Sequence, residues 1–151
     1  MILQIHSARG NIRTFGCYYF SAAFLVSKHA GLMFEVSDLE RLYDDAVARG
    51  IMSETCYVEQ PGGLFSLLGL PARYTNTHEP PNRVCRPGEI EILCWERPRP
   101  EKGPTGRWRH FTAGDGQGHV TYDPMGRART VLEGKLVSKR IFSIISKVSE
   151  A

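Results

Sequence analysis

The sequence predicts an α+β fold in which helices come first and an antiparallel β-sheet follows. The first half of the chain repeats apolar residues at helical spacing, whereas the second half alternates apolar and polar residues with the period of two found in strands. Helices followed by strands indicate segregated α and β layers. Because the 151 residues are 42% hydrophobic and show no internal repeat or linker, we expect a single domain over residues 1–151.

The most apolar stretch of the first half predicts a buried central helix. Residues 17–31 read CYYFSAAFLVSKHAG and are apolar almost all round. Lys28 and His29 stand in the last turn, and Gly31 stands where a left-handed C-cap belongs. Gly16 is expected to permit the tight turn that leads into this helix.

The remaining elements follow from local signals. Ser37 and Glu40 match a capping box that opens an amphipathic helix ending at Gly50. A turn at Pro61 and Gly62 precedes a third, shorter helix. The other expected segments are a short strand at 2–5, irregular chain at 9–13, the third helix at 63–68, a strand at 70–77, a Pro-containing loop at 77–87, a strand at 89–97, a mobile connection at 97–107, hairpin strands at 108–114 and 119–123, and a last strand at 139–145.

The hairpin is the stretch with the clearest chemical content. Residues 107–124 read RWRHFTAGDGQGHVTYDP, which places a turn at Gly116 and Gln117. In that register the residue numbers of two cross-strand partners add up to 233, so that His110 lies opposite Asp123. Side chains paired in this way have Cβ atoms about 4.5–5.5 Å apart. A carboxylate so placed fixes the tautomer of the imidazole and stabilises its charged form, as a catalytic base or acid requires.

Cys17 is the candidate nucleophile because it stands at the predicted N-terminus of the central helix. The helix dipole and the free amides there favour the thiolate, which is the reactive form. Taken alone, a cysteine beside aromatic residues is more often a small core residue. The order of a cysteine opening a helix, then a distant histidine on a strand paired with an aspartate, favours cysteine acyl transfer.

On these residues the sequence resembles the papain-like cysteine peptidases, nearest to the C39-like branch. The resemblance covers nearly the whole chain, and it implies a papain-like fold whose central helix carries the cysteine and packs on a C-terminal antiparallel sheet. It implies that Cys17 is the nucleophile, His110 the general base and then acid, and Asp123 the residue that orients His110, with no cofactor. The motifs that carry it are Gly16-Cys17-Tyr18-Tyr19, His110-Phe111-Thr112 and Thr121-Tyr122-Asp123-Pro124.

The same resemblance calls for an amide donor to an oxyanion hole, shortly before the cysteine. Asn11 lies six residues before Cys17 with a shorter side chain, and Gln4 lies thirteen residues before it with the expected chemistry. We favour Gln4 slightly, because an insertion in an irregular loop is easier to accommodate than a lost methylene at a hydrogen-bonding site.

The substrate cleft is expected to run past Gly16, Tyr18 and Trp108. C39-like members commonly carry Cys-Gly-Pro or Cys-Gly-Ala, whereas Cys17 is followed here by Tyr18 and Tyr19. Two bulky rings would narrow the cleft and suit a small or specialised acyl substrate. Packing in the core is the commoner fate of a ring such as that of Trp108, and this alternative stays open.

Composition and charge limit the classes of partner that we expect for this protein. The net charge of +3 and a pI near 8.7 are mild, so we expect no nucleic-acid partner and treat the basic residues as a solvated surface. No Sec signal and no run near the ~18 apolar residues of a membrane span is visible, which favours a cytoplasmic protein. The four cysteines show no CxxC spacing, and we expect neither a disulfide nor a metal site. The basic residues gather at Arg97, Arg99, Lys102, Arg107 and Arg109, and at Arg127, Arg129, Lys135, Lys139 and Arg140.

These observations favour a cysteine hydrolase that cleaves a peptide, isopeptide or related amide bond through a thioacyl intermediate. Its partner would be a peptide or protein substrate, with a peptidoglycan peptide as a sub-case. The alternative is an inactive module that keeps the papain-like scaffold for binding, and a third is an oligomeric structural protein.

Overall fold

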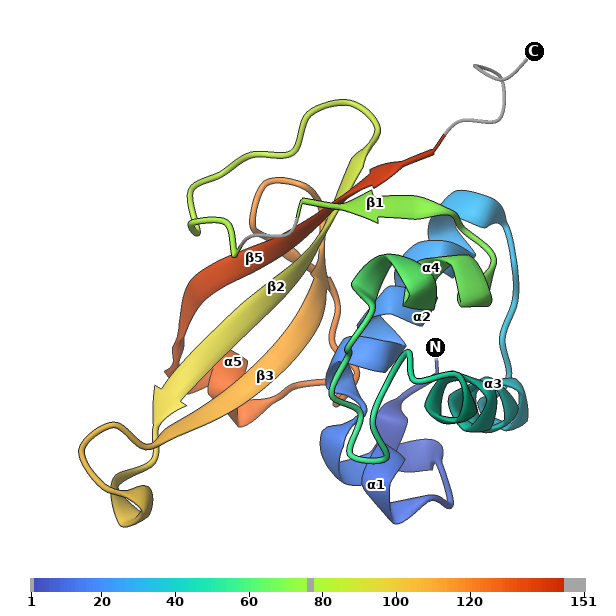
Figure 1. Ribbon diagram of the computed structural model, residues 1–151. Helices are drawn as coiled ribbons and strands as arrows, with labels where there is room; N and C mark the ends of the chain where they lie inside the picture. Colours follow the sequence, from blue (N-terminus) through green and yellow to red (C-terminus); the bar gives the residue numbers. More distant parts are fainter. Residues whose placement is uncertain (1, 76–77, 146–151) are drawn as a thin grey trace.

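The computed structural model describes residues 2–75 and 78–145, and it shows the predicted α+β architecture. Within these residues the helices α1 to α4 cluster on one side of a single antiparallel sheet, whose strand order is β1-β5-β2-β3-β4, and α5 lies apart from them beside β2 and β3 (Figure 1). The helices are α1 (Gly10–Phe15), α2 (Cys17–Ala30), α3 (Val36–Ala48), α4 (Pro61–Leu68) and α5 (Arg129–Glu133), with 3-10 turns η1 (Gln4–His6) and η2 (Pro100–Lys102). The strands are β1 (Ala72–Tyr74), β2 (Glu89–Pro98), β3 (Arg107–Gly114), β4 (Val120–Tyr122) and β5 (Lys135–Ile144).

The prediction of a buried central helix is confirmed. Helix α2 begins at Cys17 and ends before Gly31, which adopts the left-handed conformation with φ 70°. Eight of its residues are buried, and Tyr18 packs edge-on against Phe111 of β3 with ring centroids 5.0 Å apart. This contact joins the helix to the sheet through the hydrophobic core.

The chain before α2 differs from the prediction. Residues 2–5, expected as a strand, include the 3-10 turn η1, and residues 9–13, expected to be irregular, lie largely in α1. Ile12 of α1 is fully buried, so packing against the core stabilises a helix that local propensity does not indicate. Gly16 has φ −81°, and its small size rather than its flexibility matters, because a Cβ there would lie 2.5 Å from the Ile12 carbonyl oxygen.

Helix α3 begins earlier than predicted. Its N-cap is Glu35, whose backbone N–H donates to Asp38 Oδ2 at 2.9 Å, so the expected Ser37–Glu40 capping box is wrong. Glu40 has a long-range role instead, because its Oε2 accepts a hydrogen bond from Ser7 Oγ at 2.7 Å. This bond fastens the N-terminal segment to α3.

The strands are found close to where the alternating pattern predicted them. Strand β1 is shorter than the expected 70–77, of which residues 76 and 77 lie outside the described residues, and β5 begins at Lys135 rather than at 139. The predicted connection at 97–107 contains η2, and α5 was not predicted. Helix α5 spans five residues, too few for a periodic signal.

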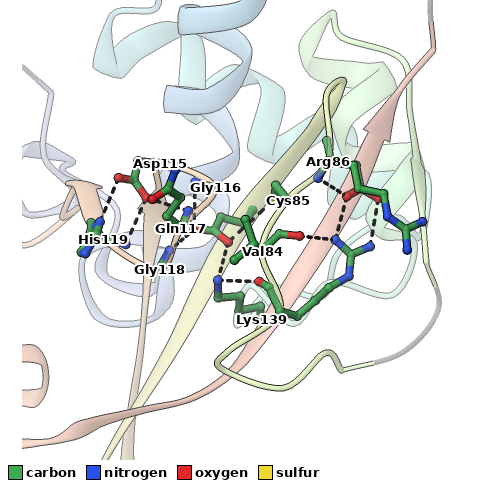
Figure 2. A network of polar contacts seen from close by, with 12 residues as sticks. Val84, Cys85, Arg86, Asp115, Gly116, Gln117, Gly118, His119 and Lys139 are labelled. Atoms are coloured by element: carbon green, nitrogen blue, oxygen red, sulfur yellow. Dashed lines mark hydrogen bonds and ion pairs between the residues drawn. The ribbon is translucent and has the colours of Figure 1, made fainter.

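The predicted register of the β3–β4 hairpin is wrong. Ala113 pairs with Tyr122, a sum of 235 rather than 233, and an irregularity then shifts the pairing of Gly114 to Val120. The reason is a buried carboxylate, because Glu91 Oε2 accepts hydrogen bonds from the backbone N–H groups of Gly116 and Gly118, both at 2.9 Å. Both glycines have positive φ, so the loop wraps around the carboxylate instead of forming a two-residue turn (Figure 2).

Glu91 is held in turn by Lys139, a residue expected on a solvated surface. Both side chains are fully buried, with Lys139 Nζ 2.9 Å from Glu91 Oε1, and Nζ also donates to the Arg83 carbonyl at 2.8 Å (Figure 2). Arg140 is also buried, so the expectation of a solvated surface is wrong for both residues. Burial of a charge requires such a partner, because unpaired it would keep its full desolvation penalty.

Replacing Lys139 tests this pair. We expect Lys139→Met to lower the free energy of unfolding by about 3–5 kcal/mol, because it leaves Glu91 buried without its cation. Denaturant unfolding followed by circular dichroism measures the change. Asp44→Asn, which removes the exposed pair with Arg9, is the control and should leave the midpoint nearly unchanged. Equal small effects of both variants would contradict the structural role of the buried pair.

Candidate active site

Helix α2 positions the candidate nucleophile. Cys17 is its first residue and is partly buried. One turn further, Ser21 Oγ donates to the Phe111 carbonyl of β3 at 3.3 Å, so the first turns of α2 lie against this strand. Cys17 is thereby brought to the residue that precedes Phe111, which is His110.

His110 lies in the β2–β3 ladder opposite Trp95 and is only 6% exposed. Its Nε2–H donates to Asp123 Oδ1 at 2.7 Å. The predicted side-chain contact is therefore present, although the register expected to produce it is wrong. Asp123 follows directly after β4 and reaches His110 from the turn beyond the strand.

The turn after β4 holds the carboxylate of Asp123 in place. Oδ1 accepts the backbone N–H of Met125 and Oδ2 that of Ala128, each at 2.9 Å. Burial raises the pKa of this carboxyl, but the hydrogen bonds from His110 and from these two backbone groups outweigh it, so the pKa is lowered overall. Asp123 is thus an ionised partner for the imidazole at neutral pH.

His110 lies between Asp123 and Cys17. Burial lowers the pKa of His110, but its hydrogen bonds to Asp123 and to the Cys17 side chain, with the charges of both, outweigh burial and raise the pKa to about 9. Since Nε2 binds Asp123, the other ring nitrogen, Nδ1, is left for Cys17. The three residues form a chain of thiol, imidazole and carboxylate in which the imidazole is charged at neutral pH.

The other three cysteines are in surroundings that keep them protonated. Burial raises the pKa of Cys56 and of Cys85 to about 12, and it also raises the pKa of Cys94. Cys85 donates to Glu91 Oε1 at 3.7 Å, a contact that suits a neutral thiol. Cys17 differs from these three cysteines, because its interaction with His110 helps to raise the pKa of that imidazole.

The two candidate oxyanion donors lie in different surroundings. Gln4 is 2% exposed, its backbone N–H donates to the Pro124 carbonyl at 2.9 Å, and its Nε2 donates to the Arg13 carbonyl at 2.8 Å. It therefore lies between the residue after Asp123 and the helix that precedes Cys17. Asn11 is exposed on α1. Of the two amides, Gln4 is the one built into the surroundings of the triad.

The expected cleft residues divide between core and surface. Tyr18 is 8% exposed against Phe111, and the Tyr19 hydroxyl donates to the Leu39 carbonyl at 2.7 Å, so neither ring narrows a cleft and that expectation is wrong. Gly16 is buried beneath α1. Trp108 is 37% exposed and, being two residues from His110 on β3, shares its face of the strand.

An apolar groove of about 640 Å³, which the sequence did not reveal, runs along α2. It follows α2 from Phe20, one turn beyond Cys17, and Tyr122, the neighbour of Asp123, forms part of its wall. The Phe24 and Tyr122 rings stack there with centroids 4.7 Å apart. Only the structure shows that these residues share one surface, because they are distant in sequence.

The described residues show neither a metal cluster nor a membrane-spanning helix. Among the described residues, no three His, Cys, Asp or Glu side chains lie close enough together to hold a metal ion. None of the helices described here combines the length and the apolar character needed to cross a bilayer.

The chain is similar to a known family of proteins. A family model described as "Protein of unknown function, DUF261" matches residues 2–144. Neither the curated proteins nor the solved structures contain a match to the chain.

The charge state of His110 is open to direct measurement. In two-dimensional NMR, one of the five histidines should titrate near pH 9, and this resonance should be absent in His110→Gln. Asp123→Asn and Cys17→Ala should each lower that pKa, because each removes a hydrogen bond and a charge that favour the imidazolium. A His110 that titrates near 6.5 in the unmodified protein would contradict the coupling.

Proposed function

The chain belongs to the DUF261 family of proteins of unknown function, and from its site geometry we propose that it is a cysteine hydrolase. The observation that supports this most directly is an imidazole held on one side by a buried carboxylate and on the other by a thiol at a helix N-terminus. A rigid base, a group that orients it and a nucleophile aimed at it are the parts that thiol acyl transfer requires. In this proposal the α+β fold is papain-like, with α2 as the central helix.

The reaction follows from the positions of these groups. The Cys17 thiolate attacks the carbonyl carbon of an amide, and the charged His110 donates its proton to the departing amine. Water then attacks the thioacyl carbon while His110, now neutral, accepts a proton from it. The C–S bond breaks, which releases the carboxylic acid and restores the Cys17 thiolate beside the charged His110. Asp123 keeps Nε2–H engaged throughout, so that Nδ1 faces the reacting atoms.

The developing oxyanion needs donors. The Cys17 backbone N–H at the start of α2 is one, and the Gln4 amide is the other in this proposal. One hydrogen of Nε2 is donated to Arg13, and the amide group carries a second. The substrate class is a peptide, isopeptide or related amide, with a peptidoglycan peptide as a sub-case.

An inactive binding module is the second candidate. The observation in its favour is the Gln4 amide, which donates to the Arg13 carbonyl within the chain. If that bond persists when substrate is bound and the second hydrogen finds no substrate oxygen, the oxyanion hole is incomplete. Turnover would then be slow while a peptide still binds.

Alkylation kinetics test the first candidate. Iodoacetamide at pH 7 should label Cys17 well before Cys85, which is also partly buried but whose pKa is about 12. His110→Gln should slow labelling of Cys17 by roughly tenfold or more, because the cation that favours the thiolate is lost. Peptide mass spectrometry over time measures each site.

His119→Gln is the matched control for this experiment, because His119 is exposed and pairs with Asp115. It should leave the labelling rate of Cys17 unchanged. Labelling of Cys17 no faster than that of Cys85, or insensitivity to His110→Gln, would contradict a catalytic thiol.

Hydrolysis of 4-nitrophenyl acetate tests the oxyanion donor without knowledge of the natural substrate. Gln4→Met keeps the side-chain length and removes the donor, so kcat should fall about 100-fold while alkylation of Cys17 is unchanged. Asn11→Leu is the matched control and should retain activity, since Asn11 is exposed on α1. The opposite pattern would assign the donor to Asn11. Circular dichroism verifies that both variants fold.

A further inference from the structure

The positive charge of the chain is concentrated in one segment. Residues 96–109, here named the cationic arm, hold five of the 19 Lys and Arg residues and two of the 16 Asp and Glu residues. The net charge of the arm is therefore +3, equal to that of the whole chain, and the charges elsewhere cancel. The arm consists of the distal ends of β2 and β3 with η2 between them, and it extends away from the helices (Figure 1).

Cations of the arm are arranged around one ring. Trp108 lies opposite Arg97 in the β2–β3 ladder. The Arg99 Cζ atom lies 3.8 Å from the centroid of the Trp108 ring, and that of Arg97 lies 5.6 Å from it. Stacking on an aromatic ring restricts a guanidinium while leaving its N–H donors free for an anion.

Carboxylates near the arm do not neutralise all of these cations. Glu96 pairs with Arg109, Glu101 with Arg99, and Glu133 of α5 with Arg129. Among the described residues, no carboxylate lies within ion-pair distance of Arg97, Lys102 or Arg107, and Arg97 Nε is buried with no hydrogen-bond partner. The positive charges of Arg97, Lys102 and Arg107 are therefore not offset by any carboxylate of the described chain.

The arm lies beside the triad. Trp108 and His110 share one face of β3, two residues or about 6.6 Å apart at ~3.3 Å per residue. A peptide that is positioned for attack beside His110 therefore has the guanidinium groups of the arm within reach of its flanking side chains. Charge complementarity at such a distance selects among substrates.

We propose that the cationic arm binds acidic side chains next to the scissile bond, so that the substrate is an acidic peptide or protein segment. This rests on the proposed hydrolase function for the position of the bond. The arm suits carboxylates better than nucleic acid, because Arg99 covers a face of the one exposed tryptophan of the described residues, on which a base would stack. Glu96 and Glu101 also interrupt any continuous track for phosphates.

Direct binding to the Cys17→Ala variant of residues 1–151, in which turnover is blocked, tests the proposal. The probes are three fluorescein-labelled octapeptides that differ only in carrying four Glu, four Gln or four Lys residues, together with an eight-nucleotide thymidine oligonucleotide. Fluorescence anisotropy should show the Glu peptide binding roughly tenfold more tightly than the Gln peptide, with an affinity that falls as salt rises. The Lys peptide should not bind.

Charge-removal variants locate the site. Arg97→Gln with Arg99→Gln should weaken binding of the Glu peptide roughly tenfold, as should Lys102→Gln with Arg107→Gln. Arg49→Gln with Arg73→Gln removes two exposed arginines outside the arm and should have little effect beyond that of salt. Thermal melts verify that the variants are folded.

Three results would overturn the proposal: equal binding of the Glu and Gln peptides, equal loss in the control variant, or tighter binding of the oligonucleotide. Its failure is distinguishable from failure of the hydrolase, because alkylation of Cys17 in the unmodified protein reports on the thiol alone. Specific binding of the Glu peptide to a chain whose Cys17 is unreactive would support the arm and contradict the hydrolase.

Discussion

The buried carboxylate of Glu91 is the constraint on which the geometry of the candidate site depends. It lies in the central strand of the sheet, and it binds the loop between β3 and β4 through two glycine N–H groups. Lys139 of the neighbouring strand compensates its charge. The loop wrapped around this side chain leads directly into β4, and it therefore sets the register in which β4 pairs with β3 ahead of Asp123. A group far from the thiol thereby sets where the carboxylate of the triad can lie.

Because the hairpin depends on a contact between distant residues, local sequence patterns predict only part of the fold. The central helix, its C-cap at Gly31 and strand β2 follow from local patterns, and the structure has them close to the expected bounds. The hairpin register does not follow from such patterns, because it is set by Glu91, more than twenty residues away in sequence. The sequence predicted the contact of His110 with Asp123 from a hairpin register that the structure does not have.

The contact survives this error for a physical reason. In the observed pairing Asp123 would continue β4 opposite Thr112, which shares a face of β3 with His110, so the two side chains remain diagonal neighbours. Backbone N–H groups of Met125 and Ala128 then turn the carboxylate toward the ring. The N-terminal segment was less predictable, because long-range bonds hold it, such as that of Gln4 to Pro124, and these leave no local signature.

The side chains of His110 and Asp123 are buried and fixed, whereas the Cys17 thiol remains accessible. His110 and Asp123 are buried, and three hydrogen bonds link them to each other and to the backbone of the turn, so their relative geometry is fixed before any ligand binds. Cys17 remains partly accessible at the end of α2. On the face of β3 that carries His110, the fold then places the exposed ring of Trp108 and its guanidinium neighbours. If the proposed hydrolase function holds, this separation would allow binding selectivity to change through the arm without disturbing Cys17, His110 and Asp123.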